Sequence, residues 1–291
     1  MKPELRIEEL DDGVVTLWLD HPKRGGMVVL DPWLLDQLHL FLDELEGRSD
    51  LGGLIVLSGS SRVFVAGADL GEIESLSDEE LHAYLTEGAE AFARIAELPC
   101  PTVAGVNGTA LGGGLELAMH CDVIIAAKQP SGQKPYRVGL PEASLGLCPA
   151  WGGTQMLPAR IDPAAAIEMM AIGFTPTFDE MPAGLFARII DNPSDLQEAA
   201  VRWIGDNPKD QPRKRPVCIE DGNRAEIEQA LGAVRDKLPE TPAAHAVVEA
   251  VEIGLADGWI DGVAAERRLL VGLRNTEPAK AKLEQFFSRK S

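Results

Sequence analysis

The sequence predicts an α/β protein with a helical C-terminal part, and three observations support that fold class. Short apolar runs typical of buried strands recur over residues 1–204. Segments with a helical spacing of apolar residues lie between these runs, and glycine-rich turns join the two kinds of element. Beyond residue 222 only helical patterns remain. The strand–turn–helix order of the first part is typical of α/β folds, whose crossovers are right-handed.

The expected elements can be placed along the chain. Residues 5–10 and 14–19 alternate apolar and polar side chains around an Asp-Asp-Gly turn, which indicates a β-hairpin. Asp31 can cap a helix whose first residue is Pro32. Buried strands are predicted over residues 53–57, 102–106 and 123–127. Helices are predicted over residues 78–97, 115–120, 163–172 and 194–204.

The second part of the chain begins with a change of composition. Residues 205–222 are rich in Pro, Asp, Lys and Arg, which indicates a linker. Four helices are predicted after it, over residues 223–237, 241–256, 261–273 and 276–287. We therefore predict a core over residues 1–204, a linker over 205–222 and a helical part over 223–291.

The composition is that of a globular protein with an acidic surface. The 291 residues carry a formal net charge of −19, and 45% of them are hydrophobic and 25% charged. Such a charge opposes binding to nucleic acid, which depends on basic contacts to phosphate. A polyanionic ligand would need local Lys or Arg residues to overcome it.

Targeting signals and covalent links are not evident in the sequence. The N-terminal segment is charged and has no apolar stretch, and no apolar run reaches the ~18–20 residues that span a bilayer. Cys100, Cys121, Cys148 and Cys218 form no CxxC pair and match no zinc or haem spacing. We expect a cytoplasmic protein with reduced cysteines, no bound metal and no membrane span.

A glycine cluster over residues 107–119 follows a predicted buried strand. Three successive glycines, Gly112 to Gly114, would let a ligand approach the backbone closely. If a helix begins there, its first amides have no partner inside the helix and can face a developing negative charge. The alternative is a tight strand-to-helix turn packed against its neighbours.

Two glutamates lie in apolar, glycine-rich surroundings. Glu116 is flanked by Leu115 and Leu117, and Glu142 lies in the segment GLPEASLG. Half-buried carboxyl groups of this kind are candidates for an acid/base pair. The alternative is that both are ordinary solvated side chains.

Four motifs together resemble those of the enoyl-CoA hydratase/isomerase (crotonase) family. They are AGADL, NGTALGGGLELAMHCD, GLPEASLG and PAWGGTQMLPARI, in this order along the chain. The resemblance covers residues 5–191. It implies a spiral of repeated ββα units and an assembly into homotrimers or hexamers. It also implies an acyl-CoA thioester as the substrate, with no further cofactor.

The resemblance assigns roles to particular residues. The amides of Ala68 and Gly113 would form an oxyanion hole for the thioester carbonyl. Glu116 and Glu142 would hold the water that adds across the double bond, one as base and the other as acid. The residues expected to bind CoA are Lys23, Arg24, Ala66, Asp69 and Leu70. For the pair at 23–24, an ordinary charged turn is the alternative.

The sequence also departs from the family pattern. Glu116 and Glu142 are 26 residues apart, a longer separation than usual, and the excess fits a loop over residues 128–136. Residues 23–31 lack the Asn-Ala pair that is common near the pantetheine. Residues 216–287 resemble the helical segment after the hydratase domain in the α-chain of multifunctional fatty-acid oxidation enzymes.

Three functions remain open at this point. The first is a 2-enoyl-CoA hydratase, with or without isomerase activity, which both glutamates favour. The second is another reaction on the same fold: isomerisation, thioester hydrolysis or decarboxylation. The third is a non-catalytic subunit that binds a partner chain of a fatty-acid oxidation complex through its C-terminal helices.

Overall fold

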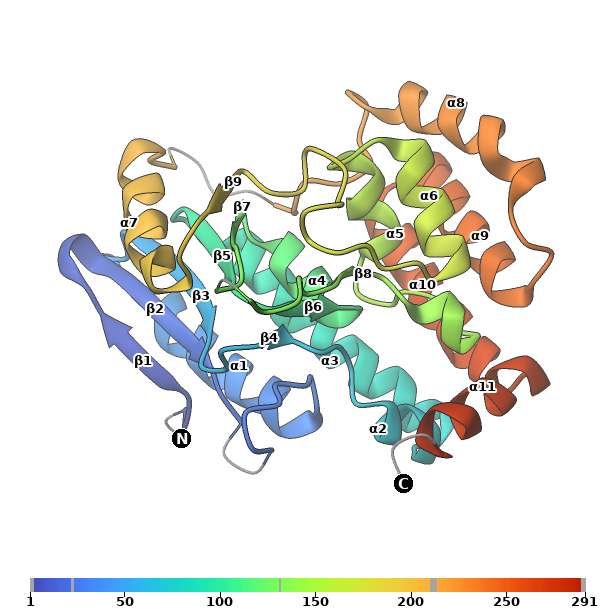
Figure 1. Cartoon of the computed structure of the whole chain (residues 1–291), viewed down its shortest axis with the longest axis horizontal. Helices are drawn as coiled ribbons and strands as arrows, with labels where there is room; N and C mark the ends of the chain where they lie inside the picture. Colours follow the sequence, from blue (N-terminus) through green and yellow to red (C-terminus); the bar gives the residue numbers. More distant parts are fainter. Residues whose placement is uncertain (1–2, 22–23, 131, 210–213, 289–291) are drawn as a thin grey trace.

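The computed structural model describes residues 3–21, 24–130, 132–209 and 214–288, and two sheets organise the first part of the chain (Figure 1). The larger sheet consists, in spatial order, of β1 (Arg6–Glu9), β2 (Val14–Leu19), β3 (Gly53–Ser58), β5 (Thr102–Val106), β7 (Val123–Ala127) and β9 (Arg188–Ile190). The smaller sheet consists of β4 (Val63–Val65), β6 (Thr109–Leu111) and β8 (Val138–Gly139). Only the predicted hairpin, β1 with β2, is antiparallel among the described pairs.

The chain repeats a ββα unit as it passes between the sheets. Each of β3, β5 and β7 in the larger sheet is followed by a strand of the smaller sheet, and then by helical structure. The helical segments are α2 (Leu70–Ser75) and α3 (Asp78–Glu97) in the first unit, α4 (Gly113–His120) in the second, and the 3-10 turn η2 (Glu142–Leu145) with α5 (Gly153–Met156) in the third. The α/β class and the spiral of ββα units are therefore confirmed.

The inner strands of the larger sheet are buried on both faces, which explains their continuous apolar runs. Leu54 and Val56 pack into the main core with α3 and α1 (Pro32–Glu46), whereas Ile55 and Leu57 pack under α7 (Leu196–Asp206). Helices α1 and α3 each begin at a side-chain cap, and that of α1 is the predicted one. Asp31 accepts a hydrogen bond from the amide of Leu34 at 2.9 Å, and Ser77 forms a capping box with Glu80.

The C-terminal helices pack against the first part of the chain. They are α8 (Arg224–Val234), α9 (Pro242–Asp257), α10 (Trp259–Arg274) and α11 (Glu277–Ser288), close to their predicted bounds. Helices α8 and α9 contact α6 (Pro163–Ile172), and α10 contacts both α3 and α5. Helix α11 returns to η2 and lies beside α2 in Figure 1. Among the described residues, no helix combines the length and apolar character needed to cross a membrane.

Candidate active site

The carboxyl ends of the three small-sheet strands meet at one cavity. Because β4, β6 and β8 are parallel, the segments that follow them emerge at the same edge of the sheet. β4 leads to Ala68, β6 leads to Gly113 and β8 leads to Glu142. All three residues, together with Glu116, line a cavity of about 580 Å³. The structure thus gathers the two expected amide donors and both expected acids in one place.

The amides of Ala68 and Gly113 are available to a ligand. Neither donates a hydrogen bond to an acceptor in the described part of the chain. Gly113 is the first residue of α4, where amides have no partner within the helix. The turn before it needs glycine, since Gly112 has a φ of +52°. A carbonyl oxygen placed between these donors would be stabilised as it gains negative charge.

Glu116 is a buried carboxyl group fixed by backbone amides. It lies in the first turn of α4 and is only 1% exposed. Its Oε1 accepts hydrogen bonds from the amides of Trp151 and Gly153, both at 2.8 Å. Trp151 is itself fixed, because its indole Nε1 donates to the carbonyl of Leu85 at 2.8 Å. Burial raises the pKa of Glu116 well above its ordinary value, and the nearby charges of other glutamates add to this shift.

Glu142 approaches the same space from η2. A Cβ atom on Gly112 would lie 2.7 Å from Oε1 of Glu142. The absence of a side chain at Gly112 therefore lets the carboxyl group of Glu142 approach the backbone at this position. Its Oε2 is buried and has no hydrogen-bond partner among the described residues. Burial raises the pKa of Glu142 to about 8, with a contribution from the charge of Glu266. Glu142 lines the cavity, and a carboxyl group with an unpaired oxygen is suited to hold or transfer a proton.

The long separation between Glu116 and Glu142 is accommodated outside the site. The loop between β7 and β8 contains most of residues 128–136, and its Tyr136 is anchored by hydrogen bonds to the carbonyls of Val106 and Ala127. Beyond the loop, β8 pairs with β6. That pairing returns the chain to the edge from which α4 starts.

Four of the five residues expected to bind CoA line the cavity, namely Arg24, Ala66, Asp69 and Leu70. The guanidinium of Arg24 is held by two carboxylates, at 2.9 Å from Asp31 and 2.5 Å from Asp69. Lys23 lies outside the described residues.

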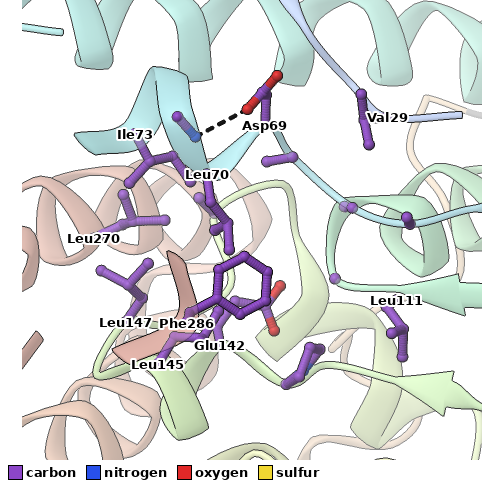
Figure 2. A pocket seen from close by; sticks show the side chains of 18 of the residues that line it. Val29, Asp69, Leu70, Ile73, Leu111, Glu142, Leu145, Leu147, Leu270 and Phe286 are labelled. Atoms are coloured by element: carbon purple, nitrogen blue, oxygen red, sulfur yellow. Dashed lines mark hydrogen bonds between the residues drawn. The ribbon is translucent and has the colours of Figure 1, made fainter. Parts of the chain in front are cut away.

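Apolar side chains form one end of the cavity. In Figure 2, Leu70, Ile73, Leu147 and Leu270 gather on the side away from Leu111. Phe286 from α11 also lines the cavity and lies beside these leucines in the view of Figure 2. An aliphatic group bound here would lose its contact with water, which favours binding.

Sequence reasoning missed a third buried carboxyl group behind the site. Glu266 on α10 is fully buried and accepts hydrogen bonds from the amides of Gly152 at 2.6 Å and Thr154 at 2.7 Å. Burial raises its pKa to about 7. A signal was present in the sequence, because Glu266 occupies a helical position in line with Val263 and Leu270 on the buried face of α10.

Comparison with known proteins adds independent information. Residues 9–236 match the family model described as enoyl-CoA hydratase/isomerase. The chain is 30% identical, over 300 aligned positions, to the fatty acid oxidation complex subunit alpha of Idiomarina loihiensis. The alignment covers 98% of this chain and 40% of that protein, so the chain spans less than half of the relative's length.

Solved structures share the fold at low sequence identity. An enoyl-CoA hydratase from Bacillus halodurans has a TM-score of 0.67 and 21% identity, over 97% of this chain and 99% of that one. The human mitochondrial delta3-delta2-enoyl-CoA isomerase has a TM-score of 0.69 and 20% identity, over 98% and 97%. The fold, the four motifs in register and the match of the family model lead to one conclusion: the chain belongs to the enoyl-CoA hydratase/isomerase family.

Proposed function

We propose that this protein is a 2-enoyl-CoA hydratase. The observation that carries the proposal is the convergence of two carboxyl groups on one cavity, the buried Glu116 and the half-buried Glu142. The same cavity presents the amides of Ala68 and Gly113, which donate to no acceptor among the described residues. Hydration needs one group to accept a proton from water and another to donate one. It also needs donors for the charge that develops on the thioester oxygen.

The two glutamates differ in a way that suggests separate roles. Burial raises the pKa of both groups, so one of them can hold a proton while the other is ionised. The two backbone hydrogen bonds that Glu116 accepts oppose this shift and favour its ionised form, so we assign Glu116 as the base. Glu142 has a buried oxygen that accepts no such bond, so we assign Glu142 as the group that carries the proton. A water oxygen attacks Cβ as Glu116 takes its proton. The π electrons move onto the thioester oxygen, and Glu142 then protonates Cα.

The test is the loss of the conjugated thioester absorbance when crotonyl-CoA or a longer 2-enoyl-CoA is added. We expect turnover by the wild type and a loss of about 10²–10⁴-fold in kcat for both Glu116→Gln and Glu142→Gln. Glu252→Gln, an exposed glutamate on α9 that pairs with Arg235, serves as the matched control. A wild type without turnover on any chain length would overturn the proposal.

Isomerisation between 3-enoyl and 2-enoyl thioesters is the second candidate. It needs one proton carrier between Cα and Cγ, and Glu142, with its unpartnered oxygen, could serve alone. With a 3-enoyl-CoA, the conjugated absorbance would then appear in both the wild type and Glu116→Gln and be lost in Glu142→Gln. A hydratase without isomerase activity would show no such signal in any of the three.

The remaining expectations belong to this proposal. An acyl-CoA thioester is the substrate and no cofactor is needed. The chain assembles as a homotrimer or hexamer in the cytoplasm, with a partner subunit of a fatty-acid oxidation complex as a further expectation. Sedimentation of the purified protein measures the assembly directly.

A further inference from the structure

The chemistry proposed above does not use Glu266, although this residue is a fully buried carboxyl group. It projects from α10, which belongs to the C-terminal part of the chain. It is absent from the residues that line the cavity, so it does not touch a bound substrate. A buried carboxylate is costly unless it is well hydrogen-bonded, so its contacts should reveal what it does.

The contacts of Glu266 alternate with those of Glu116 along the turn formed by residues 151–154. The first and third amides of this turn donate to Oε1 of Glu116, both at 2.8 Å. The second and fourth amides, those of Gly152 and Thr154, donate to Glu266 at 2.6 and 2.7 Å. The hydroxyl of Thr154 adds a third bond to Glu266 at 2.5 Å. The two carboxyl groups therefore hold one turn from opposite sides.

We propose that Glu266 is a positioning residue for the reaction: it fixes the turn 151–154, and through this turn it sets the orientation of Glu116. The inference rests on the proposed hydratase function. Removing Glu266 would leave two buried amides without acceptors, so the turn would shift to satisfy them. As the amides of Trp151 and Gly153 moved, the carboxyl group of Glu116 would lose its orientation toward the cavity.

Glu266 also acts on the site through its charge. The groups that face it are the carboxyls of Glu116 and Glu142, the thiol of Cys148 and the guanidinium of Arg267. Beyond these, α3 contributes Glu90 near Arg267, and α9 contributes Glu249, which pairs with Arg268. The negative charge of Glu266 raises the pKa of Glu116 and of Glu142. Its removal should lower both.

The test compares Glu266→Gln with Thr154→Val in steady-state hydration across pH. Glu266→Gln keeps the length of the side chain but removes the charge. Thr154→Val removes the hydrogen bond that the hydroxyl donates to Glu266 and the one that it accepts from Gln155, and no charge. For Glu266→Gln we expect a fall in kcat on the order of 10²-fold with KM unchanged. Both limbs of its pH–rate profile should move to lower pH, because the charge that raises the two pKa values is removed. For Thr154→Val we expect a smaller fall in kcat and unmoved limbs.

Hydrogen exchange does not depend on catalytic activity, so it distinguishes the positioning role of Glu266 from the proposed hydratase function. Hydrogen exchange at the amides of residues 151 and 153 should accelerate in Glu266→Gln and stay unchanged in the control Glu252→Gln. If the wild type shows no turnover, the hydratase proposal fails, and the exchange result still decides the role of Glu266. If Glu266→Gln has the same kcat, the same pH–rate profile and the same exchange rates as the wild type, the positioning role is wrong.

Discussion

Two glycines decide how closely the carboxyl groups approach the backbone of the site. A Cβ atom on Gly112 would lie 2.7 Å from Glu142, and one on Gly153 would lie 2.9 Å from Glu116. The glycine cluster and both acids could be predicted, because their motifs are local in the sequence. Glu266 could not be assigned a role, since its partners lie more than a hundred residues away and depend on how α10 packs.

Gly112→Ala should damage the site more than it damages the fold. The backbone of Gly112 has a φ of +52°, and a side chain there would also displace the carboxyl group of Glu142. We expect a cost of about 1–3 kcal/mol in the free energy of unfolding. The displacement should lower kcat on the order of 10²-fold. Urea unfolding and crotonyl-CoA turnover measure the two effects.

Gly258→Ala is the matched control for that experiment. Gly258 has a φ of +91°, and a Cβ atom there would meet nothing within 4 Å. Gly258→Ala should strain the backbone without displacing the carboxyl group of Glu142. The free energy of unfolding should therefore fall while kcat stays at the wild-type value. Equal losses of kcat in both variants would show that strain alone, and not the position of Glu142, explains the effect.

At the scale of elements, the helices were easier to predict than the strands that build the site. α1 and α3 carry their caps in the sequence, at Asp31 and Ser77. β4, β6 and β8 have only two or three residues each, too few for a periodic pattern. They were not predicted as strands, although their parallel pairing is what brings the two acids together.

Helix α11 contributes to the apolar end of the cavity. Phe286 lines it together with Leu145 and Leu147, so Phe286→Ala should open space for a longer chain. We expect the ratio of kcat/KM for a ten-carbon over a four-carbon 2-enoyl-CoA to rise about 10-fold or more. Phe174→Ala, an exposed phenylalanine after α6, is the control and should leave the ratio unchanged. An unchanged ratio in Phe286→Ala would place the acyl chain elsewhere.

On the scale of the whole molecule, the C-terminal helices complete the site. α10 supplies Glu266, and α11 supplies Lys282, whose ammonium group donates to the carbonyl of Ala143 in η2 at 3.0 Å. The helices themselves were predicted from their periodicity, but the sequence does not show where they pack. The division into a core, a linker and a helical part stays a prediction, and the contacts of α10 with α3 and α5 link the first and last of these parts.

The buried glutamates make the stability of the whole protein depend on pH. The pKa of Glu142 is raised to about 8 and that of Glu266 to about 7, from the ordinary value of 4.5. Below pH ~4.5 these groups are protonated in both the folded and the unfolded chain, so their contribution to stability is fully present. As the pH rises, the unfolded chain releases these protons first. The free energy of unfolding should therefore fall between pH ~4.5 and ~8.

Glu142→Gln tests this dependence, because it removes one of these groups and breaks no hydrogen bond of the unpartnered Oε2. In urea unfolding we expect the variant to lose less stability than the wild type between pH 5 and pH 8, by about 1–3 kcal/mol. Comparing the two proteins cancels the common effect of the net charge of −19. Glu252→Gln, on the surface of α9, should follow the wild-type slope. Parallel curves for Glu142→Gln and the wild type would mean that Glu142 titrates alike in both states, and its assignment as the proton donor would then fail.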